Sequence, residues 1–506
     1  MKKAFYLLLF LSIHFLAATI IHIPADYSSI QDGIDASVDG DTILVSTGVY
    51  SENLDLHDHN VILASLYLTT QNEFYLSQTV IEADDNDEKL IRIHDAPNSS
   101  QIIGFTLING NIAVSCNGTS PTLKNLIITD NNSDNDAGAV YAMNCTLTMS
   151  DCRICYNSAE DEGGGIYLEN STLDIRNVEL TDNTAISDGG GIYMETCSGY
   201  LENIIIMNNS SEGDGGGLVL KGVDVTMVNV LIHNNIAGDD GGGFYCSSGS
   251  TCLLSNFTIM NNSSTDKGGG IYCSSATPSL FNSIVAENEG DSGIYVAAGD
   301  DPLVTYCNFY NNEEDNFHGF DNDTGVISTI NRNGEECDEF YNLQYEPGFV
   351  FGSNSFILDD DSVLINAGSD DVTFLPETDL AGNPRVYGEY VDIGAYENQN
   401  VAVIGTQQHN IPFAEVTLSI YPNPFNPSTT ISFSVTQSSA FATIEIYNIK
   451  GQKIRTFSNH QITNSTDHQI VWDGTDQTGK SVSSGIYFAR LKTDKIEASC
   501  KMLLLK

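Results

Sequence analysis

A repeat of 26 residues constrains the fold of this chain more than any other feature. The run Gly-Gly-Gly followed by an apolar pair begins at Gly163, Gly189, Gly215, Gly241 and Gly268, in steps of 26, 26, 26 and 27 residues. Each period contains short segments in which apolar and polar residues alternate, which is typical of β-strands. Two short strands cannot bury a face alone, whereas stacked neighbours can, so the period predicts a solenoid.

An asparagine recurs at a second fixed position of the same repeat. The series consists of Asn131, Asn157, Asn183, Asn209, Asn235, Asn262, Asn288 and Asn312. Asparagine tolerates left-handed backbone and hydrogen-bonds locally, so it suits a turn. Because stacked amide side chains can bond to one another, we expect an asparagine ladder that runs from coil to coil.

The Gly-Gly-Gly-Ile-Tyr and Asn-Asn pattern resembles right-handed parallel β-helix proteins, and also the repeats of polymorphic outer-membrane proteins. This resemblance implies an all-β fold, in which a single-stranded solenoid with coils of about 26 residues extends over residues 20–398. The fold hosts lyases, hydrolases, esterases, adhesins and spacers, so it does not fix the function.

Both ends of the solenoid carry patterns of their own. The segment 23–53 resembles the first coils of pectin-esterase-like β-helices, and Ser28 or Ser29 can cap a short helix that covers the first coil. Residues 364–368 and 379–397 resemble the segment that closes many exported bacterial β-helices, and Arg385 in it is expected to be structural.

Residues 413–506 follow a linker at 399–412 and show a different pattern. Short alternating strands with Gly and Pro turns, from Tyr421-Pro-Asn-Pro-Phe-Asn-Pro to the final Lys501-Met-Leu-Leu-Leu-Lys, predict a small antiparallel Ig-like sandwich. The segment resembles the C-terminal sorting domain of type IX secretion and the related Ig-like domain of the flagellar hook-cap family. That resemblance implies export across an outer membrane, with the secretion machinery as partner of this domain.

The N-terminus has the layout of a secretory signal peptide over residues 1–19. Lys2 and Lys3 precede an apolar run that ends at Leu16, and small residues follow. The run is too short for a comfortable transmembrane helix, and no later stretch reaches the roughly 18 apolar residues of a span. We therefore expect a secreted or outer-surface bacterial protein with no membrane span in the mature chain.

The charge is concentrated in the solenoid. The whole chain has a formal net charge of −47, and residues 4–399 hold 60 acidic and only 9 basic residues, which gives −51. Nucleic-acid binding needs clustered Lys and Arg, so nucleic acid is excluded as a partner. The 11 cysteines do not have zinc-finger spacing, and a Cys246–Cys273 disulfide and an apolar ladder position are both open alternatives.

Acidic residues precede the glycine triplets in register. They are Asp136, Glu162, Asp188, Asp214 and Asp240, followed by Lys267. Equivalent positions of a β-helix stack about 4.8 Å apart, so these carboxylates form a column beside glycine carbonyl groups. Oxygen-only ligation suits Ca²⁺, and we predict weak Ca²⁺ binding along this edge; a solvated acidic edge is the alternative. No other cofactor is expected.

A row of tyrosines also follows the repeat. It contains Tyr167, Tyr193, Tyr245 and Tyr272, each followed by a residue that should point into the core. Alternation then places the rings outside, where they could stack on sugar rings, or pack beneath loops.

The sequence favours binding over catalysis. Arg153 and Arg176 are about one coil apart and are expected to form solvated salt bridges, and no catalytic residue can be assigned. The scarcity of bases argues against a lyase in particular. We therefore expect non-catalytic binding or adhesion, to a polysaccharide or cell-surface glycan; the alternative is a polysaccharide lyase or glycoside hydrolase of the pectin-lyase-like β-helix fold.

Overall fold

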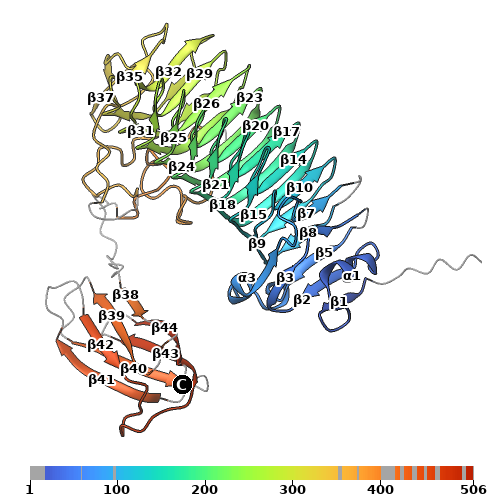
Figure 1. Ribbon diagram of the computed structural model, residues 1–506. Coiled ribbons are helices and arrows are strands. Elements are labelled where there is room, and N and C mark those ends of the chain that lie inside the picture. Colours follow the sequence, from blue (N-terminus) through green and yellow to red (C-terminus); the bar gives the residue numbers. More distant parts are fainter. Residues whose placement is uncertain are drawn as a thin grey trace, which may run out of the picture. The chain divides into compact units, whose positions relative to one another are not determined.

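The computed structural model divides the chain into two units, residues 1–403 and 404–506, which are described separately (Figure 1). The described residues are 18–57, 60–94, 99–350, 356–372, 375–400, 416–421, 425, 427–435, 441–448, 453–461, 468–492 and 497–504. The signal peptide predicted at 1–19 falls almost wholly outside them, as does most of the predicted linker. No helix of the described residues combines the length and the apolar character needed to cross a membrane.

The first unit is a right-handed parallel β-helix, as the repeat predicts. Its strands form three parallel sheets, A, B and C, with 18, 11 and 6 strands in the described residues.

Sheet A contains β1 (Ile20–Ile23), β2 (Thr42–Val45), β3 (Gly48–Ser51), β5 (Ile62–Ser65), β6 (Thr79–Glu82), β8 (Gln101–Ile103), β9 (Thr106–Ile108), β11 (Thr122–Lys124), β12 (Ile127–Thr129), β15 (Thr146–Cys155), β18 (Thr172–Thr181), β21 (Ser198–Met207), β24 (Asp224–His233), β27 (Leu253–Met260), β30 (Ser279–Phe281), β31 (Ile284–Ala286), β33 (Leu303–Thr305) and β34 (Asn308–Tyr310). Sheet B contains β4 (Leu54–Asp55), β7 (Ile91–Ile93), β10 (Val114–Asn117), β14 (Val140–Met143), β17 (Ile166–Glu169), β20 (Ile192–Glu195), β23 (Leu218–Lys221), β26 (Phe244–Ser247), β29 (Ile271–Ser274), β32 (Ser292–Ala298) and β35 (Asp315–His318). Sheet C contains β13 (Asn132–Ser133), β16 (Ser158–Ala159), β19 (Thr184–Ala185), β22 (Ser210–Ser211), β25 (Ile236–Ala237) and β28 (Ser263–Ser264).

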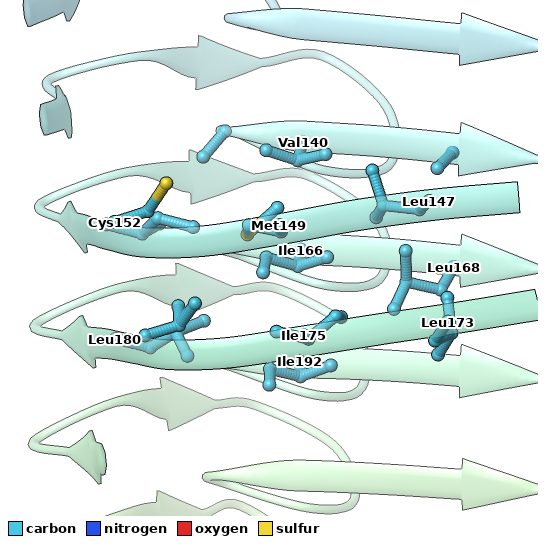
Figure 2. Packing of buried hydrophobic residues seen from close by; sticks show 14 of the residues in the cluster. Val140, Leu147, Met149, Cys152, Ile166, Leu168, Leu173, Ile175, Leu180 and Ile192 are labelled. Atoms are coloured by element: carbon cyan, nitrogen blue, oxygen red, sulfur yellow. The ribbon is translucent and has the colours of Figure 1, made fainter. Parts of the chain in front are cut away.

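The core consists of apolar side chains stacked in register. Leu147 of β15 pairs with Leu173 of β18, and Ile166 of β17 pairs with Ile192 of β20. Their side chains point into the space between sheets A and B, where they are buried (Figure 2). The inward cysteines belong to this apolar core. Ten cysteines among the described residues are free thiols, including Cys246 and Cys273, which pair in register.

The predicted asparagine ladder is present in the interior. The Asn183 side chain donates to the Ile154 carbonyl at 3.0 Å and to Asn209 Oδ1 at 2.9 Å. Its own Oδ1 accepts from the backbone N–H and the side chain of Asn157, at 3.1 and 3.0 Å. The same bonds recur from Asn131 to Asn312, so a continuous amide chain links the coils.

The glycine triplets lie where coils approach too closely for a side chain. Gly189 has a φ of +71°, and a Cβ on Gly190 would meet the carbonyl oxygen of Ser210 in the next coil. Glycine is therefore required both for its backbone conformation and for its lack of a Cβ.

The first coils carry two helical additions. Helix α1 (Ile30–Asp35) is capped by Ser29, whose hydroxyl accepts from the Asp32 N–H at 3.1 Å, and it buries Ile30 and Ile34. Residues 66–78 form a second addition, called the lid here, which contains α2 (Tyr67–Thr70) and α3 (Phe74–Gln78). Neither lid helix has a buried residue.

The closing segment, residues 356–398, does more than end the stack, because it folds back over the outer face of sheet A. Asn229 of β24 donates to the Thr378 carbonyl at 2.7 Å, and the Ala395 N–H donates to Thr258 Oγ1 of β27 at 3.1 Å. Arg385 is 1% exposed and donates to the carbonyls of Asp392, Gly394 and Ala395, which agrees with the structural role expected for it. A short antiparallel pair, β36 (Thr329–Ile330) and β37 (Glu336–Cys337), precedes this segment.

The second unit has two small antiparallel sheets. One contains β38 (Val416–Tyr421), β39 (Thr429–Val435) and β42 (His468–Trp472), and the other contains β40 (Phe441–Asn448), β41 (Lys453–Gln461), β43 (Gly485–Lys492) and β44 (Glu497–Leu504). They share one core, in which Trp472 is fully buried against Phe425 and Tyr487.

The ladder predicts a sharp loss of stability in the Asn183→Ala variant. The change removes the acceptor of the Asn157 backbone N–H and one donor to Asn209 Oδ1, and a buried group that loses its partner costs roughly 1–3 kcal/mol. We expect the free energy of unfolding, measured by urea titration, to fall by about 3 kcal/mol. The exposed neighbour Thr184→Ala serves as control, and equal midpoints for the two variants would contradict a structural role of the ladder.

Candidate functional site

The outer face of sheet A is uncovered between the lid and the closing segment. This stretch, called the open face here, is formed by β15, β18 and β21. The outward side chains of β18 and β21 include Arg176, Asn177 and Glu202, which are exposed or half-buried. In β24, under the closing segment, the corresponding Val228 and Asn229 are buried. The middle coils therefore present this face to solvent between the lid and the closing segment.

Ion pairs order the open face from one coil to the next. Arg176 bonds to Asp174 Oδ1 and to Glu202 Oε2, both at 2.7 Å, and its guanidinium lies 4.9 Å from the Tyr200 ring centroid. Arg153 Nε lies 3.2 Å from Glu179 Oε2 on the neighbouring strand. The salt bridges expected for both arginines are therefore present.

A second, external column of amides crosses the same face. Asp151, Asn177, Asn203 and Asn229 each have a left-handed backbone with φ between 54° and 57°. Each asparagine side chain donates to the residue of the preceding coil, at 2.9, 3.0 and 3.0 Å. This column gives the open face a regular row of planar polar groups.

A cleft of about 560 Å³ lies at the lid end of the open face. Its walls are formed by Tyr67, Gln71, Glu73, Leu76, Lys124, Asn125, Leu126, Ile127, Asp151 and Arg153. The lid is held over the sheet by a hydrogen bond of 2.8 Å from the Thr106 hydroxyl to the Leu76 carbonyl. The cleft thus brings side chains of both charge signs together with amide groups.

The predicted acidic column exists, but its carboxylates have a structural task. One oxygen of Asp188 accepts from the Asp214 N–H at 2.9 Å, and one of Asp214 accepts from the Asp240 N–H at 3.2 Å. Asp136 makes the same bond to Glu162 at 3.4 Å. Within the described residues, no group of three or more His, Cys, Asp and Glu side chains is arranged to hold a metal ion. Calcium on this column stays a prediction.

The predicted tyrosine row stacks along the outside of sheet B. Tyr167 and Tyr193 have ring centroids 5.2 Å apart, and Tyr245 and Tyr272 have centroids 5.0 Å apart. Val219 interrupts the row, and there the Lys221 amino group lies 4.9 Å over Tyr193 and 2.8 Å from Asp188. Tyr167, Tyr193 and Tyr272 are less than 10% exposed. Sugar stacking on this row stays a prediction, and the ring faces that it needs are turned toward neighbouring rings.

Sequence reasoning missed the open face, although one signal for it exists. One outward register position of sheet A is occupied by Ser150, Arg176 and Glu202 in successive coils, and by Val228 in the next coil. A change from polar to apolar residues at one outward position indicates the coil at which another segment begins to cover the sheet. The lid leaves no comparable signal, because its helices bury no residue.

Three family models match parts of the chain. A model described as "Right handed beta helix region" matches residues 190–363, and one described as "Periplasmic copper-binding protein (NosD)" matches residues 34–256. A model of a "Secretion system C-terminal sorting domain" matches residues 419–505. The chain thus carries a β-helix and, after it, a sorting domain. No curated protein matches.

Solved structures show only distant likeness. Latent PorU from Porphyromonas gingivalis is 21% identical over 19% of this chain and 10% of its own, with a TM-score of 0.17. PorZ, a surface component of the type IX secretion system of the same organism, is 18% identical over 18% and 11%, with a TM-score of 0.14. This chain thus spans about a tenth of each. Tailspike protein 2 of bacteriophage CBA120 is 10% identical over 96% of this chain and 76% of its own, with a TM-score of 0.29.

The acidic column predicts that stability falls as pH rises. Burial, then a hydrogen bond with Asp136 and the charges of neighbouring acids, raises the pKa of Glu162 from 4.5 to about 7. Burial likewise raises the pKa of Asp214 to about 6. A raised carboxyl pKa stabilises the fold fully below the unfolded value of 4.5, and this contribution is lost as pH rises through about 7.

Glu162→Gln therefore stabilises the protein at about pH 8, by about 1 kcal/mol after solvent screening, and leaves it unchanged at about pH 4. Thermal or urea unfolding at the two pH values measures this, with the exposed Glu160→Gln as control. The same gain at both pH values would contradict the raised pKa of Glu162.

Proposed function

We propose that this exported bacterial cell-surface protein binds a polysaccharide along the open face of sheet A without cleaving it. The observation that carries the proposal is the open face itself, bounded by the lid at one end and by the closing segment at the other. A linear chain of sugars can follow a face that crosses successive coils, because each coil repeats similar polar groups one strand spacing further on.

The chemistry of the open face supports a ligand rich in hydroxyl groups. Carboxylates and amide oxygens accept hydrogen bonds, while amide and guanidinium groups donate them, so the face can pair with both roles of a hydroxyl. Ordered side chains lose little entropy on binding, and the Arg176 pairs with Asp174 and Glu202 provide this order. Tyr200 adds a half-buried aromatic ring.

The engaged state of the two arginines of the open face argues against either of them as the base of a lyase. Proton abstraction by a lyase needs a base that is free to take the proton, whereas Arg153 and Arg176 both face carboxylates.

The C-terminal unit would direct the export of the β-helix to the cell surface. The match to a sorting domain supports recognition of this unit by the outer-membrane secretion machinery. We propose an Ig-like sandwich for it, since its two antiparallel sheets share a core around Trp472.

A glycoside hydrolase is the second candidate. Glu73 of the lid and Asp151 of β15 line the same cleft, and glycoside hydrolysis uses two carboxyl groups that flank the bond.

The proposal predicts that Arg176→Ala weakens glycan binding. The change removes the residue that orders Asp174, Glu202 and Tyr200, and a loss of about tenfold in affinity corresponds to one such interaction. Affinity is measured with the full chain against a panel of neutral and acidic polysaccharides. Arg92→Ala is the matched control, because it breaks the Arg92–Glu88 pair, which lies away from the open face.

Reducing ends and unsaturated sugars are measured in the same incubations. Binding without products supports the proposal, whereas turnover that Glu73→Gln or Asp151→Asn abolishes supports the hydrolase. Failure of every glycan to bind, or equal binding by Arg176→Ala and the wild type, contradicts the proposal.

A further inference from the structure

We infer that the cleft beneath the lid binds an acidic sugar residue, whose carboxylate lies between Lys124 and Arg153. This inference rests on the proposed glycan binding and names the chemical class of the glycan. The glycan that we infer is a polysaccharide that is neutral except for isolated carboxylate groups.

Lys124 is the first ground for the inference. The other eight basic residues of the solenoid each face a carboxylate or an aromatic ring. The pairs are Lys89–Tyr141, Arg92–Glu88, Arg153–Glu179, Arg176–Glu202, Lys221–Asp188, Lys267–Tyr295, Arg332–Tyr390 and Arg385–Glu397. Among the described residues of the solenoid, Lys124 alone has no such partner, although the solenoid is strongly acidic.

The place of Lys124 is the second ground. It lies on β11, and Arg153 lies on β15, the next strand of sheet A, and both line the 560 Å³ cleft. The Arg153 side chain is 64% exposed, so its guanidinium can meet a ligand while Nε faces Glu179. Two of the nine solenoid cations thus line one concave site, and both guanidinium and ammonium groups form strong hydrogen bonds to carboxylates.

The rest of the cleft suits the remainder of a sugar ring. Glu73 and Asp151 provide acceptors for hydroxyl groups, and Gln71 and Asn125 provide both donors and acceptors. The Asp151 carboxylate already accepts from Asn177 at 2.9 Å, which holds it in place.

The overall charge decides how many carboxylates the glycan can carry. A densely charged polymer would be repelled by a solenoid of net charge −51. At physiological salt, exposed charges are screened beyond about 8 Å, so a single carboxylate in the cleft responds mainly to Lys124 and Arg153. The cleft should therefore select an isolated acidic sugar.

The test compares three glycans with the full-length protein. They are a heteropolysaccharide with one uronate in each repeat, the same polymer after reduction of its carboxylates to alcohols, and polygalacturonate. We expect the first to bind about tenfold more tightly than its reduced form, with a preference that decreases as salt is added. Polygalacturonate should bind more weakly than the first.

The variants Lys124→Gln and Arg153→Gln should lower the affinity for the acidic polymer until the preference over its reduced form is lost. Lys89→Gln and Lys267→Gln change the net charge equally at rings outside the cleft, and they should retain the preference. Equal binding of the acidic and reduced polymers by the wild type, or loss of the preference in all four variants, overturns the inference but leaves the proposed glycan binding intact. Absence of binding by all glycans overturns both.

Discussion

The structure of the solenoid depends on the strict coil-to-coil register, which the buried asparagine ladder enforces. Each ladder amide bonds to the next coil and also to a backbone carbonyl, as Asn183 does with Asn209 and Ile154. A shift of one residue would leave several buried polar groups unpaired and would turn the apolar side chains outward. The register therefore fixes the core, and with it every outward column of side chains.

The role of each outward column of side chains depends on whether another segment packs over it. One outward position of sheet A shows this difference. It holds the apolar Val228 where the closing segment covers the sheet, and the charged Arg176 and Glu202 where the sheet is open. In the turns that lead into sheet B, the acidic column accepts hydrogen bonds from backbone N–H groups, and on sheet B the tyrosines stack on one another. The two columns that are most regular in sequence thus contribute to the architecture, while the less regular open face is free for a ligand.

Much of the fold could be predicted because the repeat is local and nearly exact. The solenoid, the asparagine ladder and the capping helix at Ser29 follow from spacing and side-chain chemistry alone. The positions of the lid and of the closing segment over sheet A could not be predicted in the same way. The closing segment, for example, depends on the contact of Asn229 with Thr378, which is distant in sequence. The burial of the tyrosine rings could not be predicted either. The alternation of residues along a strand distinguishes inward from outward side chains, but it does not show how outward rings pack on one another. The cleft follows from the lid, whose helices carry no buried apolar stripe.

The central claim is that the open face between the two covers is where the protein meets its ligand. Hydroxyl-radical footprinting of the full chain, with and without a bound polysaccharide, tests this claim most directly, because tyrosine and methionine side chains report their own exposure. Tyr200 and Met207 lie on β21 of the open face, whereas Tyr341 and Tyr390 are exposed elsewhere. Reduced labelling of Tyr200 and Met207, with unchanged labelling of Tyr341 and Tyr390, is the predicted result. Protection of Tyr341 and Tyr390 with no change at Tyr200 would contradict the account.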